Sequence, residues 1–75
     1  MKMKYIIIDN GLAEVIIVFP DLVQHGNVAM GFDKVVSAGF IIMTDGNYQC
    51  YGSSFSLKIN SRPDDTIIAN RQLRF

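Results

Sequence analysis

The chain has 75 residues, 49% of them hydrophobic, and its seven Lys or Arg residues balance seven Asp or Glu residues. This composition excludes a disordered chain and gives no general attraction to nucleic acid or acidic lipid. Cys50 is the only cysteine and His25 the only histidine, so an internal disulfide is excluded and a structural zinc site lacks its preferred ligands. We therefore expect one domain, residues 1–75, with no metal or cofactor, whose stability comes from a good core or a second chain.

The opening residues, MKMKYIII, place two lysines before an apolar run that ends at Asp9. This run is too short for the central segment of a signal peptide. No stretch of the chain approaches the roughly 20 apolar residues that span a bilayer. Together with the single cysteine, these features predict a cytoplasmic protein that has no contact with a membrane.

Residues 2–9 and 12–19 predict a first hairpin around Asn10-Gly11. Asn-Gly favours a type I′ turn, because both of its central residues need positive φ. A two-residue loop would pair Ile8 with Ala13. Apolar side chains then occur on both faces of the hairpin, which is typical of strands that are covered on both sides.

Residues 21–33 follow Pro20 and predict a short helix that two glycines weaken. Asn27 is expected to cap this helix, which would run to about Phe32. The side chains expected to pack on the sheet are Leu22, Val23, Val28 and Phe32.

Residues 34–44 and 47–52 predict a second hairpin around Asp45-Gly46. Gly39 would then lie opposite Gly52. Two facing glycines leave a shallow spot where a ligand approaches closely, or they mark a bulge or bend. The pairs expected from a two-residue loop are Ile41–Cys50, Met43–Tyr48 and Phe40–Tyr51.

Residues 53–59 alternate between apolar and polar side chains, which predicts a strand with one wet face. Phe55, Leu57 and Ile59 would share the buried face. A final helix is expected over residues 63–73. Its signals are Ser61 and Asp64 as a capping box, Pro63 in the first turn, and Ile67, Ile68 and Leu73 as docking side chains.

These elements predict an α+β fold with a mainly antiparallel sheet of about five strands, a short middle helix and a C-terminal helix. Two short helices cannot cover both faces of so apolar a sheet, so a homodimer is expected to cover the rest. The alternative is a strongly curled sheet that buries its own inner face. The side chains expected at the interface are Tyr5, Ile7, Ile16, Val18, Phe40 and Tyr51.

Catalysis would have to rest on Cys50 as nucleophile and His25 as base, with a carboxylate such as Asp21 or Asp33. Cys50 lies on an expected strand, whereas activated thiols often lie at helix N-termini or beside positive charges. A buried thiol that acts as a small hydrophobic side chain fits better. We therefore expect no catalytic residues, and a thiol-dependent hydrolase is the least favoured function.

Two places could hold a small ligand. One is the depression at Gly39 and Gly52, and the other is the N-terminus of the last helix, with Ser61 and Arg62. Asp64 and its neighbour Asp65 weigh against an anion at the second place, and helix capping explains both carboxylates.

The second half of the chain, with VVSAGF, CYGSSFSL and SRPDDTII, resembles a pattern of small uncharacterised proteins of bacteria and their phages. The resemblance implies a short phage or mobile-element product that blocks a host defence complex or sequesters a small signal. The sequence thus predicts a non-catalytic, homodimeric protein-interaction module. A small-ligand or nucleotide-binding protein is the alternative, and binding to nucleic acid is not expected. The matching residues are Gly39, Gly52, Ser54, Ser56, Leu57, Ser61, Arg62, Pro63 and Asp64.

Overall fold

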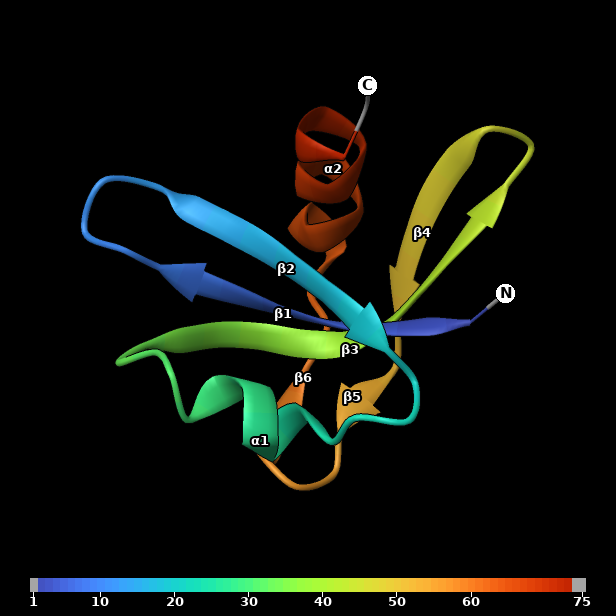
Figure 1. Cartoon of the computed structure of the whole chain (residues 1–75). Helices are drawn as coiled ribbons and strands as arrows, with labels where there is room; N and C mark the ends of the chain where they lie inside the picture. The colour runs from blue at the N-terminus through green and yellow to red at the C-terminus, as the bar shows by residue number, and fades with distance from the viewer. Residues whose placement is uncertain (1, 74–75) are drawn as a thin grey trace.

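A four-stranded antiparallel sheet forms the centre of the molecule (Figure 1), whose computed structural model describes residues 2–73. The strands lie in the order β2 (Glu14–Pro20), β1 (Met3–Asp9), β3 (Val35–Thr44) and β4 (Asn47–Tyr51). The remaining elements are α1 (His25–Ala29), a small sheet of β5 (Ser53–Ser54) and β6 (Ile59–Asn60), and α2 (Pro63–Gln72). This architecture confirms the predicted α+β fold class.

Both faces of the central sheet are covered by other parts of the chain. On one face α2 lies between the two hairpins, and on the other lie α1 and the β5–β6 hairpin (Figure 1). Tyr5, Ile7 and Ile16 pack with Ala69 beneath α2. Alternate residues of the same strands point the other way, so both faces contribute to the core. The sheet twists strongly enough for one ten-residue helix to fill its concave side.

The first hairpin has a longer loop than its sequence suggests. Ile8 pairs with Val15 rather than with Ala13, so the predicted two-residue turn is wrong. The Asn10 side chain is the reason, because its Oδ1 accepts hydrogen bonds from the backbone N–H of Leu12 and of Ala13. This closes a four-residue loop and moves the register by two residues. A shift of two keeps every side chain on its face, so the prediction of two covered faces survives.

The second hairpin forms as predicted. Asp45 and Gly46 both have positive φ, at 53° and 82°, as a two-residue type I′ turn requires. A bulge at Val36, where β1 pairing passes from Ser37 to Val35, adds to the twist of the sheet. The observed pairs Ile41–Cys50, Met43–Tyr48 and Phe40–Tyr51 are the predicted ones.

The middle helix begins three residues earlier than expected for a cap at Asn27. Gln24 occupies the N-cap position of α1, which ends at Ala29 and continues as single turns to Phe32. Val23 and Val28 pack on the sheet as predicted. Leu22 is 96% exposed and Phe32 is 37% exposed, so the expected packing of these two residues is wrong.

The segment 53–59 is a tight hairpin and not one alternating strand. Gly52 has a φ of 79°, which bends the chain away from β4, and Lys58 has a φ of 56° in the turn. The buried Ser54 hydroxyl accepts a hydrogen bond from the Leu57 N–H and closes that turn. As a result Phe55 does not share the buried face with Leu57 and Ile59 but is 98% exposed at the tip.

The C-terminal helix lies within one residue of its predicted range, but its cap is shifted. Arg62 and not Ser61 is the N-cap residue, and Asp65 and not Asp64 accepts its backbone N–H. Ile68 and Leu73 dock as expected, whereas Ile67 is 57% exposed. Within residues 2–73 neither helix has the length and apolar character needed to cross a membrane.

Side chains of α2 also pair with the outer backbone groups of both edge strands. On β4, Asn70 accepts from the Tyr48 N–H and donates to its carbonyl, and Thr66 accepts from the Cys50 N–H. On β2, Gln72 accepts from the Ile16 N–H and donates to the Glu14 carbonyl. Unpaired edges invite strand addition, and α2 blocks it at these positions.

Candidate functional site

The residues predicted to form a shallow ligand site come together, but their space is filled. A Cβ atom on Gly39 would lie 2.5 Å from the Tyr51 carbonyl oxygen and 3.4 Å from Cβ of Ser61. Ser61 donates both its backbone N–H and its hydroxyl to the Gly52 carbonyl, at 3.0 and 2.8 Å. The two glycines therefore allow a backbone bend, and the predicted depression holds the chain itself and not a ligand.

The predicted anion site at the start of α2 is also occupied by protein groups. The Arg62 guanidinium donates to Glu14 at 2.7 Å and to Asp65 at 3.0 Å. The hydrogen bond with Glu14, followed by that with Asp65, raises the pKa of Arg62 above its usual range. With two carboxylates already on this cation, an anionic ligand has little to gain there.

A buried carboxylate beside this cation was missed by the sequence reasoning. Asp65 has no exposed surface, and its two oxygens accept four hydrogen bonds. The donors are the Tyr5 hydroxyl at 2.5 Å, the Ser37 hydroxyl at 2.9 Å, and the backbone N–H and Nε of Arg62. Capping alone thus does not account for Asp65. Burial, followed by the hydrogen bond to Asp65, raises the pKa of Tyr5.

The predicted homodimer interface is largely inside the chain. Tyr5, Ile7 and Ile16 are buried beneath α2, so they are not available to a partner, and Val18 packs against the same cluster. Phe40 is half-buried and Tyr51 is 41% exposed. The helix α2 covers this face of the sheet, and the sheet does not bury its own inner face.

Cys50 and His25 lie on opposite faces of the sheet and cannot form a catalytic pair. Cys50 packs at the α2 side, where burial and then the charge of Asp65 raise the pKa of its thiol to about 11. His25 lies at the start of α1 on the other side. This excludes the thiol and imidazole geometry that a cysteine hydrolase requires.

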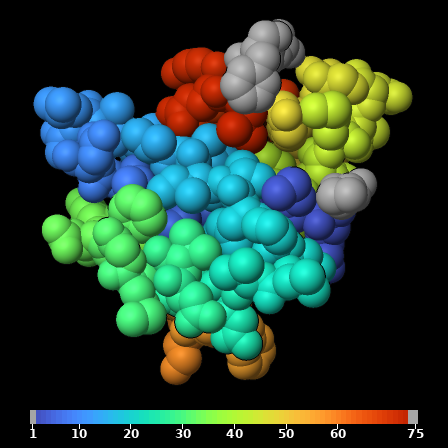
Figure 2. Space-filling model, in the orientation of Figure 1, coloured from blue at the N-terminus to red at the C-terminus, as the bar shows by residue number. Residues whose placement is uncertain are grey.

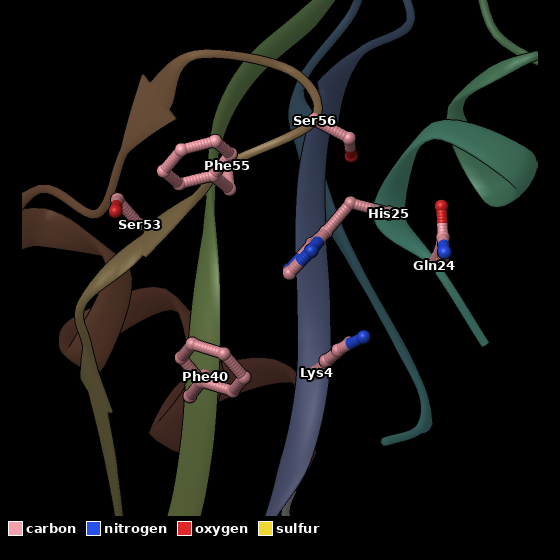
Figure 3. Close-up of a pocket in the computed structure, with 7 residues that line it drawn as sticks. All are labelled: Lys4, Gln24, His25, Phe40, Ser53, Phe55 and Ser56. Carbon is pink, nitrogen blue, oxygen red and sulfur yellow. The ribbon is translucent and has the colours of Figure 1, made fainter. Parts of the chain in front are cut away.

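A hollow of about 550 Å³ opens on the α1 side of the sheet (Figure 3). α1 contributes its first residue and its cap, β1 and β3 form the floor, and β5 with the following turn forms a wall. Such a volume suits a small organic ligand. The lining residues are Lys4, Gln24, His25, Phe40, Ser53, Phe55 and Ser56.

His25 is the most buried of these residues, with 4% of its surface exposed. Its ring packs edge-on against Phe19 and Phe40, with centroids 5.5 and 5.9 Å apart. Its Nε2 lies 2.8 Å from the Gly39 carbonyl oxygen. A carbonyl only accepts, so Nε2 carries the hydrogen of that bond. These contacts hold the imidazole in one orientation, and Figure 3 shows its ring pointing from α1 into the hollow, toward Phe40 and Phe55.

Two lysines give this side of the sheet a positive character. Lys4 Nζ donates to the Val23 carbonyl at 3.0 Å and lies 3.9 Å from Asp21. Lys2 Nζ lies 4.0 Å from the same carboxylate and 4.6 Å from the centroid of the Phe40 ring. Both ion pairs with Asp21 are at the limit of contact. The lining residues include a lysine and no carboxylate, and an anion in the hollow would compete with Asp21 and the Val23 carbonyl for this lysine.

Phe55 is the exposed part of the wall. It lies in the turn between β5 and β6, which projects beyond α1 at the bottom of the molecule (Figure 2). An aromatic ring that is 98% exposed makes almost no contribution to the core, so the fold alone gives no reason for it. Sequence reasoning missed this site because it placed Phe55 on the buried side of a strand.

No known protein family matches the chain, and neither a curated protein nor a solved structure matches it. The geometry of the hollow and the side chains around it are therefore the basis on which a function is inferred.

Proposed function

We propose that this chain is a non-catalytic binding protein that holds a small organic ligand in the hollow between α1, the sheet and the β5–β6 hairpin. The observation that carries the proposal is the position of Phe55. Its exposed ring stands at the mouth of a hollow of about 550 Å³ whose other ring, Phe40, belongs to the floor. A ligand between them would cover the Phe55 ring, which is the most exposed aromatic side chain within residues 2–73.

Binding rather than turnover is supported by the chemistry of the lining. His25 uses Nε2 to hold the Gly39 carbonyl, and Cys50 lies across the sheet with a raised thiol pKa. The Ser56 hydroxyl lies 3.5 Å from the Ser54 hydroxyl, which is not a base that would activate a nucleophile.

The proposal is tested by thermal shift against a chemically diverse panel of neutral, cationic and anionic metabolites. A ligand at 100 times its Kd adds about 2.7 kcal/mol to the free energy of unfolding. We expect at least one compound to raise the melting temperature of the natural protein and of Leu12→Ala. The same compound should have a weaker effect on Phe55→Ala. Leu12 is a matched control, because it is 96% exposed at the opposite hairpin turn.

Absence of any shift across the panel would contradict small-ligand binding. A shift that Phe55→Ala leaves unchanged would place the ligand elsewhere, which would also contradict the proposed site.

A second candidate function is the capture of a protein partner, and the exposed apolar side chains favour it. Tyr51 and Phe55 are exposed near the hollow, and Met43 is 57% exposed on the β3–β4 hairpin. These side chains would serve a homodimer contact or the inhibition of a bacterial host defence complex. Light scattering near micromolar concentration tests the homodimer, and a strict monomer would contradict it.

A further inference from the structure

We propose that the ligand of the hollow is a mononucleotide. Its planar base carries hydrogen-bond donors, and its sugar carries a phosphate group. This inference rests on the proposed function, because it specifies what the same hollow binds. Three features of the lining carry it: aromatic rings on two sides, an oriented imidazole, and a positive charge without a carboxylate in the lining.

The rings provide the contact for a heterocycle. Phe40 comes from β3 and Phe55 from the β5–β6 turn, and both line the hollow (Figure 3). Phe40 also faces Tyr51, with centroids 5.9 Å apart and planes inclined by 32°, which holds its ring in place. A base that stacks on an aromatic side chain gains about 1–3 kcal/mol, corresponding to roughly 5-fold to 150-fold in affinity.

The imidazole and its neighbours provide partners for the edge of a base. Because Nε2 of His25 carries a hydrogen toward the Gly39 carbonyl, a neutral ring presents Nδ1 as an acceptor. An exocyclic amine or a ring N–H of a base would donate to it. The amide of Gln24 and the hydroxyl of Ser56, on either side of His25, both donate and accept. A purely apolar ligand would cover Nδ1 of the buried His25 ring without giving it a donor, which is unfavourable.

The lysines provide the partner for phosphate. Lys4 lines the hollow, and Lys2 stands over Phe40. Their counter-charge is Asp21, which is 3.9 and 4.0 Å from the two ammonium groups and is itself 45% exposed. Contacts of this length are weak, so a phosphate would compete with Asp21 for both lysines. For Lys4 the phosphate would also compete with the Val23 carbonyl, which accepts from Nζ at 3.0 Å.

Isothermal titration with AMP, GMP, CMP and UMP tests the inference, with each matched nucleoside and ribose 5-phosphate as controls. We expect at least one nucleotide to bind ten times more tightly than its nucleoside and than ribose 5-phosphate. Equal affinity for nucleotide and nucleoside would overturn the role of the phosphate. Equal affinity for nucleotide and ribose 5-phosphate would overturn the role of the rings. Tighter binding of a short oligonucleotide would overturn a mononucleotide as the ligand.

Variants locate the two contacts. Phe55→Ala should weaken nucleotide binding about tenfold or more, while Leu12→Ala should not change it. Lys2→Met should weaken binding of the nucleotide several-fold and leave the nucleoside unaffected. Lys34→Met is the matched loss of charge, since Lys34 pairs with Asp9 at the far end of β1.

Asp21→Asn should tighten nucleotide binding, because it removes the competing carboxylate. An unchanged affinity in both Phe55→Ala and Lys2→Met would overturn the assignment.

The outcome also separates this inference from the proposed function. If another compound of the diverse panel binds in a Phe55-dependent way and no nucleotide binds, the nucleotide inference falls and small-ligand binding stands. If no compound binds at all, both fall.

Discussion

The two faces of the central sheet differ in how their polar groups are used. On the α2 face, a buried carboxylate receives four hydrogen bonds, and helix side chains pair with both edge strands. On the α1 face, short elements cover the sheet incompletely and leave a hollow with an exposed ring. The difference indicates that paired polar groups stabilise the α2 face, whereas the α1 face combines an apolar cluster with a hollow whose exposed rim can change without loss of the fold.

The strongest test of this comparison is the loss of the buried carboxylate. Asp65→Asn replaces one carboxylate oxygen with an NH2 group, so two of the four donors lose their acceptor and Arg62 loses a charged partner. Removing one member of a buried charged pair costs about 3–5 kcal/mol. We expect a loss of this size in the free energy of unfolding from urea denaturation. Asp64→Asn is the control, since Asp64 is exposed in the same turn. If Asp65→Asn lowers the free energy of unfolding by less than about 1 kcal/mol, the paired polar groups of the α2 face do not stabilise the fold as expected.

A second test opens one edge of the sheet. Asn70→Ala leaves the N–H and carbonyl of Tyr48 without their partner on α2. The expected loss is about 1–3 kcal/mol in the free energy of unfolding, because partly buried polar groups become unpaired. The exposed β4 edge should also promote association, which light scattering detects. Arg71→Ala, at an exposed position of the same helix, should change neither. An unchanged free energy of unfolding in Asn70→Ala would contradict the proposal that α2 protects the edge of β4.

A third test uses pH. The Tyr5 hydroxyl has a raised pKa in the folded chain and a value near 10 when unfolded. Above pH 10 the unfolded state loses this proton first, so the free energy of unfolding falls as pH rises. The expected slope is about 1.4 kcal/mol per pH unit. The pKa of Cys50 is about 11 in the folded chain and 9.0 in the unfolded chain. The thiol therefore also lowers the free energy of unfolding as the pH rises above 9.

The Tyr5→Phe variant separates the two groups. It lacks the phenolic proton, so its stability should fall less steeply above pH 10 than that of the natural protein. Equal slopes would show that Tyr5 is not responsible for the alkaline loss.

The smallest expected change in the free energy of unfolding is for a variant on the α1 face. Phe55→Ala should change the free energy of unfolding by no more than about 0.5 kcal/mol, because the ring is 98% exposed. Urea denaturation measures this beside Ile7→Ala, a fully buried site where a loss of about 2–5 kcal/mol is expected. A large loss at Phe55 would mean that its ring serves the fold and not a ligand.

Local patterns in the sequence determined the two hairpins, the C-terminal helix and the burial of both strand faces. These features depend on turn chemistry and on side-chain periodicity, which act over a few residues. Even the wrong loop at Asn10 left the faces correct, because the register moved by two residues. The alternation of residues 53–59 predicted one strand, and this prediction was wrong. The bend at Gly52 and the hydrogen bond of Ser54 override a pattern that is only seven residues long.

Only the tertiary structure decided where the polar groups meet. Tyr5 and Asp65 are 60 residues apart, and Gln72 reaches Ile16 across 56 residues. His25 and the β5–β6 turn come together only because both pack on the same face of the sheet. A sequence shows which of these groups can donate or accept a hydrogen bond. Their pairing depends on strand order and on the position of α2. Three residues expected at a homodimer interface, Tyr5, Ile7 and Ile16, are therefore in the core, and the turn residue Phe55 forms the wall of the proposed site.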